Sequence, residues 1–315
     1  MEKISVRKAY GEALADYGAV NSNVVVVVAD VSSSVQTDYF AECFPERFFN
    51  IGIAEQGMVG TAVGLALGGM IPFVNTFAGL MLRAVEQIRT CVAYARTNVK
   101  LIGGYAGLSD FKDGPTHHSI MDLAIMRAIP NMVVITPADA IEAQKMIPVL
   151  AEYDGPVYLR ISRATTPVIF NDKHKVEIGK GVILREGKNV TLIGNGIMVS
   201  RCLKATKILA KEGIDAQVVN MHTIKPLDIS IVEQAVEIGA IVTAEEHSII
   251  GGLGGAVAEA LGSYCPVPLE RVGIRDTFTE TALNPESLLD HYGMAVEDII
   301  KAALRVIKRK EEKKE

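Results

Sequence analysis

The stretch NVVVVVAD, Asn23–Asp30, decides the fold of this 315-residue chain. Five consecutive valines are apolar on both faces of a strand, which is typical of a strand buried inside a parallel sheet rather than one half exposed to water. The run ends in a polar turn, as a buried parallel strand does at its carboxyl end. A segment with helical spacing, Ser5–Val20, precedes it. The stretch therefore predicts a strand in the middle of an α/β domain.

Strands and helices alternate outward from this run. Alternation of this kind predicts a doubly wound parallel sheet, with ligands bound at the carboxyl ends of its strands. Further strands are expected over 70–77, 99–107, 132–136 and 156–162, and helices over 55–69, 79–95, 119–129 and 138–150. A polar segment containing Pro167 interrupts the pattern, and a second alternating unit follows it. We expect one domain over residues 1–175 and a smaller α/β domain over 190–315.

Composition excludes several classes of protein. Hydrophobic residues make up 49% and charged residues 22%, the net charge is −5, and no basic stripe occurs, which argues against a nucleic-acid partner. No apolar run reaches the length of a membrane span, and no signal peptide is visible. The four cysteines lack paired spacing, so we expect reduced core thiols in a cytoplasmic protein.

The stretch NIGIAEQGMVG, Asn50–Gly60, places one carboxylate, Glu55, among small and apolar residues. One interpretation is an acid at a helix N-terminus, where the helix dipole favours negative charge. The other is a carboxylate kept in apolar surroundings so that it can share a proton with a buried ligand nitrogen. The motif alone leaves both open.

Other polar residues follow strands at points where a ligand could bind. DGPTHH, Asp113–His118, places an acid and two histidines before a helix, where they could act as donors or proton shuttles or simply form a surface turn. Arg160 and Arg163 end a strand on diverging faces, so we expect one to bind an anion and the other to form a surface ion pair. Arg7 and the serines over 32–34 are weaker candidates.

Taken in order, these segments resemble the transketolase family over nearly the whole chain. VRKAYGEAL, IAEQGMVG, PFVNTFAGLMLRAVEQIR, DGPTHH and ISR look like its pyrimidine-binding domain, and residues from about 190 look like its C-terminal domain. The resemblance implies a cytoplasmic enzyme of the pentose phosphate pathway. Such an enzyme transfers a two-carbon ketol unit from a ketose phosphate to an aldose phosphate with thiamine diphosphate, a cofactor that performs the carbanion chemistry.

The resemblance also implies roles for single residues. Glu55 matches the glutamate that hydrogen-bonds the aminopyrimidine ring nitrogen of thiamine diphosphate and favours its imino tautomer. His117 matches a residue near the donor carbonyl, which makes it a catalytic and substrate-binding candidate. Asp113 matches a contact to the substrate hydroxyl beside that carbonyl, whereas His118 has no assigned role. The positions that hold the substrate phosphate are Arg7, Ser34 and Arg163.

Two positions depart from the family pattern. Leu80 stands where a phenylalanine often stacks on the pyrimidine ring, and Phe77 aligns with the preceding phenylalanine. We expect both to bind the cofactor through apolar contact, without ring stacking at position 80. Tyr105 stands where a substrate-binding histidine is usual, which leaves the donor sugar open.

The chain lacks the GDG motif through which the family holds the diphosphate by way of a metal. We therefore expect no metal ligand on this chain, and a divalent metal, Mg²⁺ or Ca²⁺, on a partner N-terminal subunit. The resemblance implies a split transketolase in which this chain dimerises and two partners complete a heterotetramer.

Three other functions remain open. The β subunit of a 2-oxo acid dehydrogenase has the same domain order and size. A deoxyxylulose phosphate synthase-like enzyme condenses pyruvate with a triose phosphate, although both halves normally share one chain. A non-catalytic regulatory subunit could keep the fold, but the joint presence of Glu55, Asp113, His117 and Arg163 argues against it.

Overall fold

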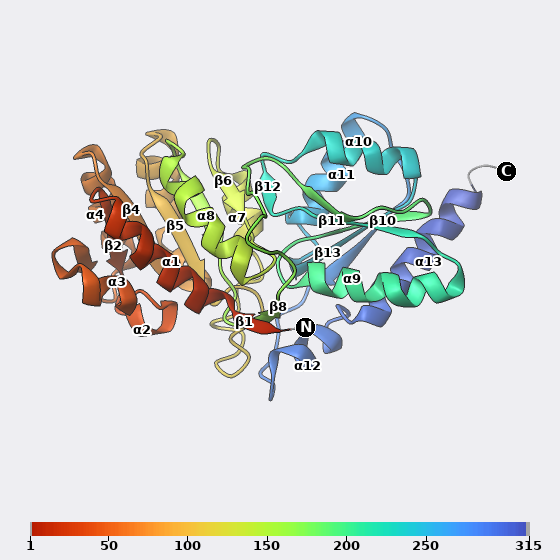
Figure 1. Cartoon of the computed structure of the whole chain (residues 1–315), viewed down its shortest axis with the longest axis horizontal. Coiled ribbons are helices and arrows are strands. Elements are labelled where there is room, and N and C mark those ends of the chain that lie inside the picture. Colours follow the sequence, from red (N-terminus) through yellow and green to blue (C-terminus); the bar gives the residue numbers. More distant parts are fainter. Residues whose placement is uncertain (1, 313–315) are drawn as a thin grey trace.

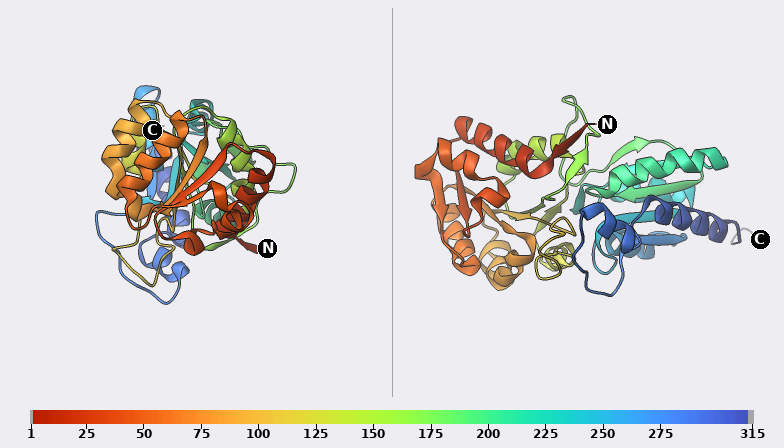
Figure 2. Two further views of the ribbon diagram at one scale, coloured as in Figure 1. Left: turned by 90° about the vertical axis from the view of Figure 1, so that its left-hand side faces the viewer. Right: turned by 90° about the horizontal axis from the view of Figure 1, so that it is seen from below.

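A computed structural model describes residues 2–312 of the chain. Two α/β units lie side by side, one built from the N-terminal residues and one from the C-terminal residues (Figure 1). The right-hand view of Figure 2 shows the two units end to end along the long axis, with the N-terminus near their junction. The mixed α/β architecture with parallel sheets confirms the predicted fold class.

The first unit contains a seven-stranded sheet. In spatial order its strands are β12 (Thr223–Lys225), β6 (Val133–Ile135), β7 (Val157–Arg160), β5 (Lys100–Gly104), β4 (Ile71–Phe77), β2 (Val24–Val28) and β3 (Phe48–Asn50). All neighbours pair in parallel except β12, which is antiparallel to β6. The valine run forms β2, and all five of its side chains are buried. Strand β12 comes from beyond residue 190 and was not expected in this sheet.

Helices cover both faces of this sheet, as successive valines of β2 show. Val24, Val26 and Val28 pack in one apolar cluster with α1 (Val6–Val20) and α8 (Ala140–Glu152). Val27 packs in another with α4 (Glu55–Leu67). The remaining helical segments of the unit are α2 (Ser32–Val35), α3 (Asp38–Cys43), η1 (Pro45–Arg47), α5 (Ala78–Met81), η2 (Leu82–Ala84), α6 (Val85–Gln87), the π-helical η3 (Ile88–Tyr94) and α7 (Asp122–Ala128).

The single helix expected over 79–95 is wrong in detail. The chain there forms four short segments, α5, η2, α6 and η3, and the backbone at Ala84 leaves the α-helical region (φ −104°, ψ 16°). The segment packs against the start of α4, where the Gln56 side chain donates to the Arg83 carbonyl at 3.3 Å. Tertiary contact therefore changes the backbone that local helical spacing predicts.

The second unit contains a five-stranded sheet. Its strands in spatial order are β14 (Leu269–Ile274), β13 (Ile241–Ser248), β10 (Val190–Gly194), β11 (Ala216–Asn220) and β9 (Val182–Arg185). Its helical segments are α9 (Met198–Leu209), η4 (Ala210–Glu212), α10 (Ile229–Ile238), α11 (Leu253–Ser263), α12 (Pro285–His291) and α13 (Val296–Glu312). A separate two-stranded ribbon, β1 (Lys3–Ser5) with β8 (Thr165–Pro167), lies at the junction of the two units (Figure 1).

Buried polar groups at the end of β13 join the units. Glu245 caps α11 by accepting from the backbone N–H groups of Leu253 and Gly254 at 2.7 and 2.8 Å. Glu246 reaches the first unit, where its Oε1 accepts from the Leu108 N–H at 2.9 Å. Its carboxyl group lies so close to Gly107 that a Cβ there would come within 2.4 Å of it. The junction therefore depends on a carboxyl group with almost no access to water.

The cysteine prediction is partly wrong. All four cysteines are free, and Cys202 is buried, but Cys43 and Cys265 are exposed and Cys91 is intermediate. An apolar residue type predicts burial only on average, and these side chains lie where the helices and loops face solvent. No helix within residues 2–312 is long and apolar enough to cross a membrane.

We expect Glu246→Gln to stabilise the protein at alkaline pH. Burial raises the pKa of Glu246 to about 7 from 4.5, so between these values the folded state holds a proton that the unfolded state lacks. Raising the pH through this window therefore lowers the free energy of unfolding, by an amount on the order of 2–3 kcal/mol. Glutamine keeps an acceptor for Leu108 and carries no charge, so the variant should melt higher than the native protein at alkaline pH.

The measurement is the melting temperature of both proteins at about pH 5.5 and about pH 8. Most of the stability change caused by Glu246 falls between these two pH values. Glu233→Gln, at an exposed carboxylate of α10, is the matched control and should keep the native pH dependence. An unchanged pH dependence in Glu246→Gln would show that another group is responsible.

Candidate active site

The candidate residues gather at the carboxyl ends of four adjacent parallel strands. Ser34 follows β2, Phe77 ends β4, Tyr105 follows β5 and Arg163 lies just beyond β7. Arg7 reaches the same region from the first turn of α1. Residues far apart in the sequence meet here because parallel strands all end at one edge of the sheet.

Glu55 is the first residue of α4, and only 3% of it is exposed. Its Oε2 lies 3.5 Å from Nε of Arg83, whose own side chain is 64% exposed. Within residues 2–312, Arg83 is the one cationic side chain this close to the Glu55 carboxylate. The acid thus occupies a helix N-terminus, as the first interpretation requires, and is withdrawn from water, as the second requires.

Aromatic rings form an apolar wall at the carboxyl ends of β4 and β5. Phe77 and Tyr105 stack with ring centroids 4.2 Å apart and 16° between their planes, and Val35 is buried with them. Leu80 packs against this cluster and is only partly buried. Tyr105 has a φ of +55°, a conformation that large L-residues seldom adopt and one that points to a constraint at this position.

Two guanidinium groups flank Tyr105. Arg7 donates to the Tyr105 hydroxyl at 2.8 Å and to the Ser34 carbonyl at 2.7 Å. Arg7 and Arg163 lie over the tyrosine ring at 5.3 and 5.0 Å from its centroid. Arg163 also forms an ion pair with Asp110, whose side chain is fully buried, at 2.5 Å. A cavity of about 360 Å³ opens onto this group, lined by Arg7, Ser109, Phe111, Arg163, Ala164, Thr165, Ile197, Asn284, Pro285 and Glu286.

The second unit holds the DGPTHH loop in place. His118 is buried, its Nδ1 lies 2.6 Å from the Thr279 hydroxyl, and its Nε2 lies 3.0 Å from the Asp110 carbonyl. Burial lowers the pKa of His118, so it bridges the two units as a neutral ring. Gly114 has a φ of +78°, and Thr281 packs so closely on it that a Cβ would come within 2.6 Å. The structure thereby gives His118 a structural role.

The other two polar residues of this loop remain accessible. Asp113 is exposed. His117 is partly buried, with Nδ1 3.0 Å from the Thr116 hydroxyl. Its ring lies in an edge-to-face arrangement with Phe77, the ring centroids 6.1 Å apart. Both side chains are therefore available to a ligand.

The expectation of a surface ion pair at Arg160 or Arg163 is wrong for Arg160. Arg160 is 4% exposed, and its Nε donates to Asp122 at 2.8 Å. Asp122 also accepts from the Tyr158 hydroxyl at 2.8 Å, and Arg160 lowers the pKa of Asp122 despite complete burial. Arg160 also donates to the Glu246 carbonyl at 2.9 Å, so it belongs to the junction between the units.

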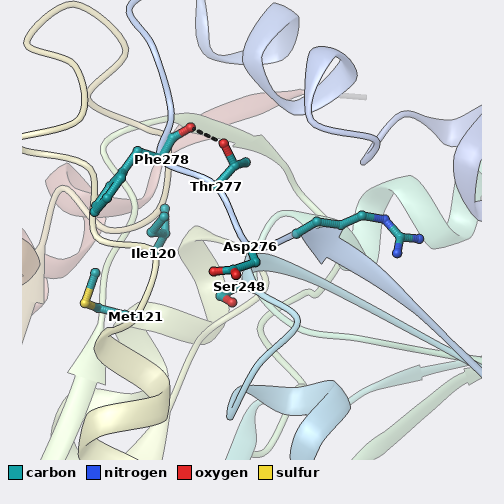
Figure 3. A pocket seen from close by; sticks show the side chains of 7 residues that line it. Ile120, Met121, Ser248, Asp276, Thr277 and Phe278 are labelled. Carbon is teal, nitrogen blue, oxygen red and sulfur yellow. Dashed lines mark hydrogen bonds between the residues drawn. The ribbon is translucent and has the colours of Figure 1, made fainter.

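A separate hollow lies on the seam between the units. It has a volume of about 250 Å³ and is lined by Ile120, Met121, Ser248, Arg275, Asp276, Thr277 and Phe278. Phe278 lies along its rim, and the Thr277 hydroxyl donates to the Phe278 carbonyl at 3.0 Å (Figure 3). None of the candidate residues lines this hollow, so it is distinct from the cavity at Arg7 and Arg163.

Sequence reasoning missed three residues of the site: Arg83 beside Glu55, Asp110 beside Arg163, and Thr279 beside His118. Asp110 carried a weak signal, because it stands three residues before Asp113 in the same loop. Arg83 lies within a quoted motif that carried no assignment for it. Thr279 lies in the other unit, and no local pattern connects it to His118.

Comparison with known proteins agrees with this architecture. The family model described as "Transketolase, pyrimidine binding domain" matches residues 2–168, and the model described as "Transketolase, C-terminal domain" matches residues 179–299. A Methanocaldococcus jannaschii protein named "Putative transketolase C-terminal section" is 46% identical over 308 residues, which cover 96% of each chain. A "6-deoxy-6-sulfo-D-fructose transketolase subunit" of Clostridium sp. strain MSTE9 is 40% identical, covering 98% of this chain and 97% of that one.

A solved structure has the same fold over nearly the whole chain. The protein described as "Split gene transketolase, inactive beta4 tetramer" superposes with a TM-score of 0.90 at 44% identity. The match covers 97% of this chain and 99% of that one. With both family models matched in order, and relatives of this similarity matched over 96–99% of their length, the chain belongs to the transketolase family and contains its pyrimidine-binding and C-terminal domains.

Proposed function

We propose that this chain is the C-terminal subunit of a split transketolase that transfers a two-carbon ketol unit between sugars bearing an anionic group. The observation that carries the proposal is the gathering of a buried carboxylate, an aromatic wall and two guanidinium groups at one edge of the sheet. The first two suit a heteroaromatic cofactor ring, and the guanidinium groups suit the anionic end of a substrate.

The residues around Glu55 fit the pyrimidine ring of thiamine diphosphate, the cofactor of the family. A ring with an N–H donor needs a buried acceptor and apolar faces. Glu55 offers the acceptor, and the Phe77, Tyr105 and Leu80 cluster at the same edge of the sheet offers apolar faces. Thiamine diphosphate, when bound, supplies the carbanion chemistry. Glu55 holds a proton at the ring nitrogen, Phe77 and Leu80 limit the position of the ring by apolar contact, and the surrounding side chains exclude water.

The other candidates bind and orient the sugar. Arg7, Ser34 and Arg163 hold its anionic end, and Tyr105 fixes both guanidinium groups. Asp113 and His117, the accessible pair of the DGPTHH loop, contact the hydroxyl and carbonyl at the reacting end. His117 is suited to hydrogen-bond the carbonyl there, because an imidazole ring can donate or accept.

A partner chain completes the site in this proposal by holding the diphosphate through a divalent metal. The outer face of α4 offers a surface for association: Gly60 and Gly64 have open space where a Cβ would stand. Two large apolar side chains of the same unit, Ile53 and Tyr94, are 75% and 84% exposed. The split-gene structure is described as an inactive beta4 tetramer, which supports self-association of this chain. The Clostridium relative is named as a subunit, which supports a partner chain.

The test of the reaction is a comparison of substrates with the reconstituted complex. Ketol transfer from xylulose 5-phosphate to ribose 5-phosphate, with 6-deoxy-6-sulfofructose as a second donor, is expected. Decarboxylation of pyruvate without ketol transfer would instead identify a 2-oxo acid dehydrogenase β subunit, and condensation of pyruvate with a triose phosphate a synthase. Failure to bind thiamine diphosphate in calorimetry would favour the regulatory subunit.

We expect Arg7→Ala to raise the KM for phosphorylated ketoses by about 10- to 100-fold, the loss that follows when a charged hydrogen bond of 1.5–3 kcal/mol is removed. The kcat/KM for an unphosphorylated ketose should change little. Lys8→Ala, at the next and exposed residue of α1, is the matched control. Equal losses for both kinds of substrate would contradict the assignment.

Arg163→Ala should show the same selectivity together with a lower melting temperature. The difference between the two variants follows from their partners. Arg7 has no carboxylate partner in the described part of the chain, whereas removing Arg163 leaves the buried Asp110 carboxylate without its ion pair.

A further inference from the structure

We propose that Asp110 is a specificity-determining residue. It sets the net charge of the groove, by which we mean the cavity at Arg7 and Arg163 where the anionic end of the substrate binds. This inference rests on the proposed function and names a residue that neither the motifs nor the family resemblance assigns. Asp110 pairs with Arg163 and so leaves Arg7 as the one guanidinium of the groove without a carboxylate partner in the described chain. The groove should therefore favour substrates whose anionic end group, called the tail below, carries little negative charge.

The geometry shows that the pair is built into the site. The Asp110 side chain is fully buried, and its Oδ1 receives the Arg163 Nη1 at 2.5 Å. Its other oxygen, Oδ2, is buried and makes no hydrogen bond among the described residues. Arg163 is itself positioned, because its backbone N–H donates to the Ser109 hydroxyl at 3.1 Å and its guanidinium lies over the Tyr105 ring. A carboxylate with an unsatisfied oxygen therefore sits directly behind one of the two cations that face the cavity.

Charge decides what this arrangement favours. The energy between two charges is proportional to their product, so a negative group behind Arg163 opposes a doubly charged tail about twice as strongly as a singly charged one. A phosphate monoester is a dianion through most of the range above its second pKa of about 6, whereas a sulfonate is a monoanion at every working pH. Asp110 therefore disfavours the phosphate more than the sulfonate.

Protonation of Asp110 should release Arg163. Burial and the neighbouring Asp113 carboxylate raise the pKa of Asp110, and Arg163 lowers it in part. Asp110 accordingly takes up a proton on acidification at a higher pH than an ordinary aspartate. The charged and titratable groups that face it, or share its cavity or loop, are Arg163, Asp113, His118, Lys112, His117, Arg7 and Glu286, the last paired with Lys3 at 2.9 Å.

The experiment uses the complex with its partner chain, thiamine diphosphate and a divalent metal. Three donor ketoses are compared, with a phosphate, a sulfonate and a neutral hydroxyl at the far end, and each anionic kcat/KM is divided by the neutral one. The ratio cancels titrations of groups at the reacting end. Asp110→Asn is expected to raise the phosphate ratio about tenfold. The sulfonate carries half the charge, so its interaction energy with Asp110 is half as large, and the sulfonate ratio should rise only by the square root of tenfold, about threefold.

Glu286→Gln is the matched control. It also removes one negative charge from the cavity wall, but the side chain is 63% exposed, so solvent screening should keep both ratios within about twofold of native. If Asp110→Asn fails to fold, the native complex supplies the second measurement. Its sulfonate ratio should rise on acidification from about pH 8, because the raised pKa of Asp110 makes it take up a proton at a higher pH than an ordinary aspartate, whereas the sulfonate does not titrate.

The outcomes separate the inference from the function on which it rests. Equal changes in the two ratios, a loss of both in Asp110→Asn, or a native sulfonate ratio independent of pH would overturn the role of Asp110 while leaving ketol transfer intact. A loss of both would mean that Asp110 only supports Arg163. A complex that neither binds nor converts any of the three ketoses would overturn the proposed function and this inference together.

Discussion

Glu55→Gln is expected to lower ketol transfer by about 10²–10⁴-fold or more, the range that general acid–base catalysis contributes. Glutamine keeps the shape of the side chain but cannot hold the proton of a ring nitrogen as a carboxylate does. The two interpretations of this acid predict different results. If Glu55 only favours the start of α4, the substitution costs about 0.3–1 kcal/mol of stability and leaves activity intact. If it acts on the cofactor, activity falls and stability hardly changes.

The measurement pairs kcat of the reconstituted complex with the melting temperature of the variant. Only a weak ion pair with the exposed Arg83 is lost, at 3.5 Å, so the melting temperature should stay close to native. Arg83→Gln is the control for that ion pair and should keep most of the activity. A folded Glu55→Gln complex that retains more than about a tenth of native activity would rule out the catalytic role, because it would fall short of any acid–base contribution.

The chain purified by itself is expected to show no ketol transfer and little affinity for thiamine diphosphate. The sequence has no GDG motif, so this chain has no recognised means of holding the diphosphate through a metal. Hard divalent cations need several oxygen ligands, and a diphosphate without its metal and counter-charges binds weakly. The result should be all or none, since half of the cofactor site cannot hold the cofactor in a productive position.

Mixing this chain with its partner chain should restore ketol transfer if the enzyme is split between two chains. The coupled assay of xylulose 5-phosphate with ribose 5-phosphate is run with each chain alone and with both, in the presence of thiamine diphosphate and Mg²⁺ or Ca²⁺. Light scattering on the same samples follows assembly, because exposed side chains such as Ile53 and Tyr94 should be covered by self-association or by the partner. Full activity from this chain alone would refute the split-enzyme proposal and require a diphosphate site within its own residues.

The sequence predicted the elements whose signals are local. The valine run specified a buried parallel strand because β-branched, two-sided apolar segments have few other stable environments, and β2 is buried at all five valines. The spacing around Ser5–Val20 predicted α1, and the acid in IAEQGMVG predicted a helix start that the structure places at Glu55. In these cases the signal lies within a short stretch of consecutive residues, where hydrophobic periodicity and residue propensity determine the local structure.

Tertiary structure alone decided which side chains meet. The neutralisation of Arg163 by Asp110, the bridge from His118 to Thr279 and the burial of Arg160 with Asp122 join residues from different elements. Strand β12, at Thr223–Lys225, adds to a sheet whose other members end before residue 161. Contacts of this kind depend on packing across the whole chain, and a side chain's charge or burial is determined by neighbours that local periodicity does not specify. The sequence by itself therefore determined the kind of sheet and the candidate groups along its edge, whereas the packing of the two units determined which of those groups are charged, paired or accessible.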